Sequence, residues 1–100
     1  MSYAEFEMKV IQWGEARQIV QHSNPYAQAM KTQEELNELF EAIEAKNRAA
    51  MIDAYGDILV TLIMGCACAD LDLVTCLEKA YEEIKDRKGY LNEEGIFVKQ

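Results

Sequence analysis

The sequence predicts an all-α protein: a four-helix bundle that assembles with further copies of itself. Half of the residues are hydrophobic and only one is proline. Apolar positions recur at spacings of three and four along nearly the whole chain, which is the spacing of one helix face. A chain of 100 residues suffices for one domain with one core, so residues 1–100 are interpreted as a single helical domain with a short C-terminal tail from about residue 90.

The first half of the chain predicts two helices, from about Tyr3 to Gln21 and from about Pro25 to Ala45. The segment "HSNP" separates them. In it, Ser23 or Asn24 can cap the second helix, and Pro25 can occupy the first turn, where a missing N–H costs nothing. The apolar stripe of the second helix consists of Leu36, Leu39, Phe40 and Ile43.

The second half predicts two more helices and an extended tail. After the break "KNR", a third helix from about Ala49 to Ala69 is apolar on nearly every side, which indicates a central, buried helix. Asp70 or Asp72 can cap a fourth helix, from about Leu73 to Lys88, which Gly89 would terminate. The tail "YLNEEGIFVKQ" is typical of a turn followed by a short extended piece.

Four helices joined by short loops predict an antiparallel bundle. A bundle of 100 residues is thin, and an apolar third helix needs more cover than three neighbouring helices provide. We therefore expect a homodimer or a larger homo-oligomer.

Composition and charge exclude several classes of function. The net charge of −8 disfavours binding to nucleic acid or to anionic membranes, because both require a basic surface. The N-terminus "MSYAEFEMKV" lacks the basic start and apolar stretch of a signal peptide. The longest uncharged apolar run, Ile58 to Ala69, spans 12 residues, whereas a membrane span needs about 20. We expect a soluble, cytoplasmic protein with no membrane partner and reduced cysteines.

The second predicted helix carries a cluster of acidic residues within "KTQEELNELFEAIE". At 100° per residue, Glu34, Glu35 and Glu38 share one side of the helix with Lys31. Taken alone, such a pattern is typical of a solvated acidic face.

The third predicted helix changes this interpretation, because Asp53 and Asp57 interrupt an apolar stripe that also contains Val60 and Met64. Burying an unpaired carboxylate costs several kcal/mol. The positive end of the helix dipole can account for Asp53 in the first turn, but Asp57 lies too deep in the helix for that.

Two acidic pairs that face each other across a bundle bring carboxylate oxygens together, and such oxygens select Mg²⁺ or, as an alternative, Mn²⁺. A di-iron site would need Glu-x-x-His pairs, and the single histidine, His22, lies at the end of the first helix.

Carboxylate-bound Mg²⁺ mostly serves phosphates, so a phosphate site with its own cations is expected. The segment "IKDRKG" places Lys85, Arg87 and Lys88 at the end of the fourth helix. These side chains can hold phosphate or merely complement the helix dipole. Lys31 is a further phosphate-binding candidate.

The residues "KTQEELNEL", "DAYGDILVTL", "AYEEIKDRKG" and "GIFVK" resemble the MazG-like branch of the all-α nucleoside triphosphate pyrophosphohydrolases, in particular the short single-domain forms of phages. The resemblance covers about Lys31 to Lys99, and its motif is EExxE on one helix followed by ExxD on the next. It implies hydrolysis of a (d)NTP to the monophosphate and pyrophosphate with Mg²⁺. The implied fold is a four-helix bundle that forms homodimers or homotetramers.

Carried onto this sequence, the motif of the family falls on Glu34, Glu35, Glu38 and Asp57. The chain departs from it at Ala54, where the family has glutamate, and Asp53 is the nearest acid. Asp53 can therefore be a metal ligand or a group that supports the ligands.

The implied activity leads to a hypothesis for the role of each candidate. Glu35, Glu38, Asp57 and Asp53 would hold the metal, which offsets phosphate charge and activates water. Glu34 would accept the proton of the attacking water, and Lys31, Lys85, Arg87 and Lys88 would bind phosphate oxygens. Trp13 and Tyr26 are either core aromatics or residues that stack on the base.

Two other interpretations compete with the hypothesis that the protein is an enzyme. One is a non-catalytic nucleotide-binding or regulatory protein of the same fold, which the change at Ala54 favours. The other is a helical dimerisation module whose acidic residues are only solvated.

Overall fold

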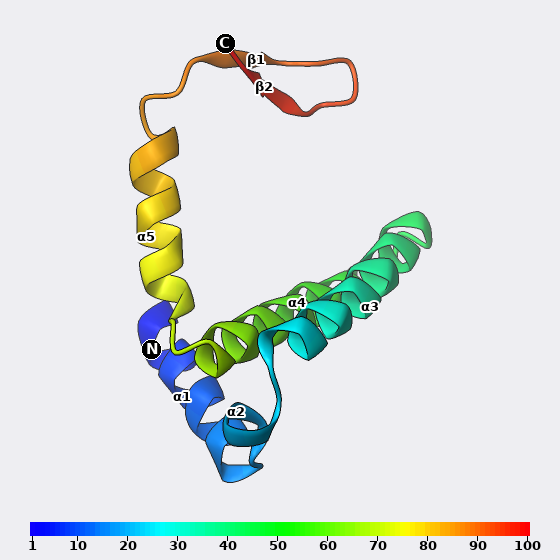
Figure 1. Ribbon diagram of the computed structural model, residues 1–100. Coiled ribbons are helices and arrows are strands. Elements are labelled where there is room, and N and C mark those ends of the chain that lie inside the picture. Colours follow the sequence, from blue (N-terminus) through cyan, green and yellow to red (C-terminus); the bar gives the residue numbers. More distant parts are fainter.

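A computed structural model describes residues 1–100 and contains five helices and one two-stranded sheet (Figure 1). In chain order the elements are α1 (Tyr3–Ala16), α2 (Ile19–His22), α3 (Pro25–Glu44), α4 (Arg48–Cys68), α5 (Leu73–Ile84), β1 (Gly89–Leu91) and β2 (Phe97–Lys99). The all-α prediction is confirmed.

Side chains that cap backbone N–H groups fix where the helices begin. Asn24, Asn47 and Asp72 each accept a hydrogen bond from the N–H three residues later, at 2.8, 3.1 and 2.8 Å. These bonds satisfy donors that the first turn of a helix leaves free. The expected first helix is divided, because Gln18 has a φ of 64°, in the left-handed region, and α2 starts after it.

The largest contact in the fold is the antiparallel pair of α3 and α4 (Figure 1). The two helices are joined by a tight connection in which Lys46 has a φ of 53°. The hydroxyls of Thr32 and Thr61 meet between the helices at 2.7 Å. We refer to α3 and α4 together as the helical hairpin.

The core of the helical hairpin differs from the predicted stripe. Small and medium side chains fill it, and Met64 is the most deeply buried, at 2% exposure. Of the expected stripe on α3 only Leu39 is buried, whereas Phe40 is 56% exposed. The prediction was wrong because α3 turns Leu39 and Ala42, rather than its bulkier neighbours, toward α4. The expectation of a buried central helix is also wrong in part, because α4 exposes large apolar residues, namely Ile52, Tyr55, Leu59 and Leu62.

The helices of one chain do not close into a bundle. Helix α5 contacts only α1 and α4 and rises away from α3 (Figure 1). It ends at Ile84, four residues before the predicted end, and Gly89 begins β1 instead of terminating the helix. The radius of gyration is 15.6 Å, above the value of about 13 Å for a compact domain of this length. One chain therefore does not form the expected four-helix bundle by itself.

A polar contact holds the start of α5 against α1. Glu7 is buried and accepts hydrogen bonds from the Tyr3 hydroxyl at 2.8 Å and from the Val74 N–H at 3.4 Å. Burial and the neighbouring Glu7 carboxylate raise the pKa of Tyr3 to about 12. The carboxylate thus fixes where α5 leaves the rest of the chain.

The C-terminal residues form an antiparallel hairpin in which Tyr90 pairs with Val98. The Asn92 side chain accepts hydrogen bonds from the N–H groups of Glu94 and Ile96, both at 2.9 Å. Gly95 takes the positive φ of 82° that the turn requires. The expected extended tail is therefore present as two short strands.

Helix α4 is long and apolar enough to cross a membrane by length and composition alone, a test that the core helix of a soluble protein also passes. It carries Asp53 and Asp57 and packs against α3. Each such charge at the centre of a membrane helix would cost about 2.5–3.5 kcal/mol.

Gly14 is a position where an added side chain should disturb the packing of α1 on α4. A Cβ at this position would meet the Met64 side chain, so Gly14→Ala should lower the free energy of unfolding by about 1–3 kcal/mol. Gly56→Ala is the matched control, because nothing lies within 4 Å of its Cβ position, and it should stabilise the helix by about 0.4–1 kcal/mol. Urea denaturation measures both, and equal effects would contradict the packing of α1 on α4.

Candidate functional site

Three carboxylates from the helical hairpin converge at one point. Glu35 and Glu38 come from adjacent turns of α3, and Asp57 comes from α4. One ligand atom from each lies within 4.8 Å of the other two. The predicted meeting of acids from the two helices is thus present for these three residues, which we call the acidic cluster.

Glu35 is the unusual member of the acidic cluster, because it is only 8% exposed. Its Oε1 lies 3.6 Å from Lys31 Nζ, whereas its Oε2 is buried without a hydrogen-bond partner. Burial, followed by the adjacent Glu38 carboxyl group, raises the pKa of Glu35 above its ordinary value, and Lys31 opposes this shift. A buried acceptor without a partner normally costs 1–3 kcal/mol.

The acidic cluster fits a divalent cation. Oxygens bound to one Mg²⁺ at 2.0–2.1 Å lie about 2.9 Å apart when they are neighbours and about 4.2 Å apart when they are opposite, so three oxygens within 4.8 Å of one another can reach one ion if each moves by about 1 Å. All three residues offer the hard oxygen donors that Mg²⁺ and Mn²⁺ accept. A cation would also supply the partner that Glu35 Oε2 lacks.

A cavity of about 470 Å³ opens beside the acidic cluster, and we call it the acidic pocket. Glu38 and Asp57 line it together with Asp53 and Glu41. Asp53 therefore lies in the same pocket as Asp57 but outside the close group of three. The sequence reasoning missed Glu41, although its position three residues after Glu38 places it on the same side of α3.

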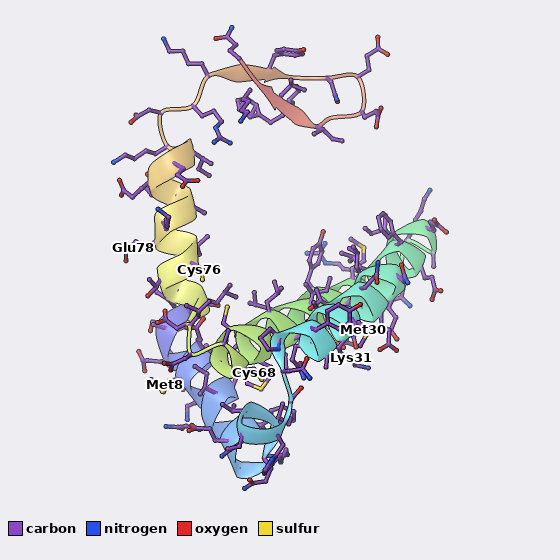
Figure 2. All side chains as sticks on the ribbon, viewed as in Figure 1. Met8, Met30, Lys31, Cys68, Cys76 and Glu78 are labelled. Atoms are coloured by element: carbon purple, nitrogen blue, oxygen red, sulfur yellow. The ribbon has the colours of Figure 1, made fainter.

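Lys31 lies between the acidic cluster and a second cavity on α3. Its Nζ lies 3.6 Å from Glu35 and 3.7 Å from Glu34, and Figure 2 shows it on the N-terminal half of α3, next to Met30. Glu34 is exposed and does not join the acidic cluster. It lines a second cavity of about 470 Å³, which we call the Trp13 pocket.

The two aromatic candidates lie in different places. Trp13 lines the Trp13 pocket together with Gln28 and Lys31. Tyr26 is exposed and lines a separate cavity of about 420 Å³ with Met30 and Leu36. Neither side chain is buried in the core.

The cations after α5 lie apart from the acids of the same chain. Arg87 and Lys88 follow the end of α5, and Lys85 forms an ion pair with Glu82 at 2.7 Å. Helix α5 makes no contact with α3, and its end lies well away from the helical hairpin (Figure 1). One chain therefore does not bring these three cations to its own acidic cluster.

Comparison with known protein families gives one match: the model of the MazG nucleotide pyrophosphohydrolase domain matches residues 24–91. The chain belongs to the MazG family. No curated protein and no solved structure matches it.

The residues matched to the MazG family run from the cap of α3 to the end of β1. They contain the acidic cluster and the cations after α5, but not Trp13. MazG domains are nucleotide pyrophosphohydrolases, which act on acid anhydrides and typically use a divalent metal. The acidic cluster is the place in this chain that could hold such a metal.

The raised pKa of Glu35 predicts how stability changes with pH when no metal is present. The native state holds this proton more tightly than the unfolded chain, so the contribution of Glu35 to stability is greatest below its ordinary pKa of 4.5 and falls as pH rises above it. Glu35→Gln removes this pH-dependent loss of stability. In EDTA, the melting temperature of Glu35→Gln should therefore rise relative to that of the natural chain as the pH increases from about 4 to about 8.

Glu34→Gln is the matched control, because the neighbouring Glu34 is exposed. Its melting temperature should follow that of the natural chain across the same pH range. A parallel curve for Glu35→Gln would contradict a buried, unpartnered carboxylate.

Proposed function

We propose that this MazG-family protein is a Mg²⁺-dependent pyrophosphohydrolase that converts a (d)NTP to the (d)NMP and pyrophosphate. The observation that carries this proposal is the convergence of Glu35, Glu38 and Asp57, with a buried Glu35 oxygen that has no partner. Mn²⁺ has the same preference for oxygen ligands and is the alternative metal.

The acidic cluster and the acidic pocket beside it have different proposed parts in holding the metal. Glu35, Glu38 and Asp57 are the proposed ligands, and Asp53 and Glu41 add negative charge from the wall of the pocket. The bound ion would offset the charge of the triphosphate and make the phosphorus easier to attack. Because Asp53 lies outside the close group, its loss should weaken metal binding less than the loss of Asp57.

Glu34 and Lys31, which line the Trp13 pocket, are proposed to act on the substrate. Glu34 is exposed, with Lys31 Nζ 3.7 Å away, and is the group proposed to accept the proton of the attacking water. The Lys31 ammonium group lies between Glu34 and Glu35, where it can bind a phosphate oxygen and keep the substrate next to the acidic cluster.

A homodimer is proposed because one chain leaves too much apolar surface exposed. The chain exposes 7761 Å², whereas a compact monomer of 11.4 kDa exposes about 5,800 Å². The excess of about 2,000 Å² is the area that one partner buries in an obligate dimer. Between α5 and the helical hairpin lies an apolar groove of about 580 Å³, which is lined by Leu59, Leu62 and Leu77 among others. Pairing through this side would supply the missing helices of the bundle.

The same pairing would bring the cations after α5 to an acidic cluster. Lys85, Arg87 and Lys88 follow the end of α5, and we call α5 together with these residues the arm. Helix α5 extends away from α3 of its own chain (Figure 1). In a dimer, this arm can reach the hairpin of the second copy. We therefore assign the three residues to the phosphate site of the partner, so that each active site contains acids from one chain and cations from the other.

Glu38→Gln should abolish Mg²⁺-dependent release of pyrophosphate, because it removes a charged ligand from the acidic cluster. The loss should be at least about a hundredfold, with the helical circular dichroism signal retained. A colorimetric pyrophosphate assay across the common dNTPs measures it. Glu78→Gln is the matched control: Glu78 is an exposed glutamate on α5, away from the helical hairpin (Figure 2), and the variant should keep full activity. Unchanged turnover in Glu38→Gln would contradict the proposed function.

A shared active site predicts complementation between two inactive variants. Glu38→Gln and Arg87→Ala should each lose activity as homodimers. Refolding them together forms mixed dimers in which one site has both an intact acidic cluster and an intact arm, so about a quarter of the natural activity should return by random pairing. Light scattering checks the dimer in the same samples. Absence of recovery in a confirmed mixed dimer would show that the arm does not act on the partner.

A further inference from the structure

The corner between α4 and α5 brings two cysteines of one chain together. Cys66 lies in the last turn of α4, and Cys76 ends the first turn of α5. The Leu71 N–H donates to the Cys66 carbonyl oxygen at 2.8 Å, and the Cys76 N–H donates to the Asp72 carbonyl oxygen at 3.2 Å. Because Leu71 and Asp72 are consecutive residues, these two bonds hold both cysteines at the same corner.

The side chains of the two cysteines are neighbours. Cys66 and Leu62 line one cavity of about 250 Å³, and Cys76 and Leu62 line the apolar groove between α5 and the helical hairpin. Figure 2 shows Cys76 near the start of α5. Burial, followed by the adjacent Cys76 thiol, raises the pKa of the Cys66 thiol. The shared contact with Leu62 and the effect of one thiol on the other place the two sulfur atoms near each other, as a disulfide requires.

The third cysteine faces another part of the chain. Cys68 Sγ lies 3.7 Å from the carbonyl oxygen of Ile19 in α2, and Cys68 lines neither of these two cavities. Cys66 and Cys68 are two residues apart in one helix, so their side chains point about 200° apart around its axis. Cys66 is therefore the cysteine of α4 that is placed to bond with Cys76.

The two neighbouring thiols differ in their access to solvent. Cys76 is exposed, whereas Cys66 is half-buried, and all three cysteines of the chain are free. A dissolved oxidant therefore reaches Cys76 first. The less accessible Cys66 thiol is then placed to react with the oxidised sulfur, which is the arrangement of a reactive cysteine and its resolving partner.

We propose that Cys66 and Cys76 form a reversible disulfide when the protein meets a peroxide. The Cys76 sulfur attacks an oxygen of hydrogen peroxide, the O–O bond breaks, and Cys76 becomes a sulfenic acid as one water leaves. The Cys66 sulfur then attacks the Cys76 sulfur. The S–O bond breaks, and the hydroxyl leaves with the Cys66 proton as a second water. The two thiols lose two electrons in total, which the peroxide gains, and a small thiol in excess reduces the bond again.

The disulfide would restrain the arm at its base. Helix α5 contacts α1 and α4 but not α3, and the bond would join its first turn to the last turn of α4. The closed loop would run from Cys66 to Cys76, and such a loop removes conformations from the unfolded chain. The bond uses no residue of the acidic cluster, so it does not depend on the proposed function.

Mass spectrometry of the purified protein tests the bond. Hydrogen peroxide in small excess, followed by alkylation, should give a chain that is lighter by about 2 Da before alkylation and that keeps one of its three free thiols. Cleavage before Asp70 and Asp72 separates the two cysteines, and their peptides should remain linked until dithiothreitol is added. The oxidised chain should migrate as a single chain on a denaturing gel without reductant.

Cys68→Ser is the matched control, because its thiol faces α2, and the variant should keep the linked peptides and the loss of mass. Cys66→Ser and Cys76→Ser should each lose both. The oxidised natural chain should also melt about 5 °C or more above its reduced form, whereas the melting temperature of Cys76→Ser should not rise on oxidation.

The outcomes bear on the disulfide alone, because no step measures release of pyrophosphate. Linked peptides in the natural chain and in Cys68→Ser, but in neither of the other variants, would support the proposal. Three free thiols after oxidation, a bond that includes Cys68, a bond between two chains, or oxygen added to Cys76 without a bond to Cys66 would overturn it. Equal melting temperatures of the linked and reduced chains would show that the bond does not restrain the fold.

Discussion

The antiparallel packing of α3 against α4 is the contact on which the rest of this structure depends. It is the largest contact between elements, and it uses small side chains such as Ala42 and Ala54 where the two helices meet. Small residues let the helix axes come close, so carboxylates on the two helices can approach one another. The same packing buries Glu35 and leaves one of its oxygens without a partner. Stability and metal binding are therefore opposed at one residue, and a cation would relieve the conflict.

Most of the large apolar side chains do not contribute to the core of one chain. The packed core of the helical hairpin is narrow, and residues such as Phe40, Tyr55 and Tyr81 remain exposed. Such a surface is typical of chains that complete their core with a partner. Glu7 accepts a hydrogen bond from the start of α5, and α5 contacts α1 and α4 but not α3. The geometry that makes the monomer incomplete is thus the geometry that would let two chains share their active sites.

The two pockets on α3 present two kinds of chemistry. The acidic pocket offers only carboxylates as charged groups and suits a metal with its phosphates. The Trp13 pocket offers an indole, other apolar side chains and a few polar ones. Lys31 lies between them, in contact with Glu34 and Glu35. Because one helix carries residues of both pockets, the register of α3 fixes their separation.

The sequence by itself determined the helical class and three of the acids that meet, and it limited the caps of α3 and α5 to Ser23 or Asn24 and to Asp70 or Asp72, because these features depend on periodicity and on neighbours within four residues. It also identified the MazG family through the same local motif. Only the tertiary structure decided that Leu39 rather than Phe40 faces α4, that α5 departs from the hairpin, and that Glu41 joins the acidic pocket. A helical wheel defines which residues share a face, but the rotation of each helix toward its neighbour depends on packing across the whole fold, and a stripe meant for a partner chain resembles one meant for the core.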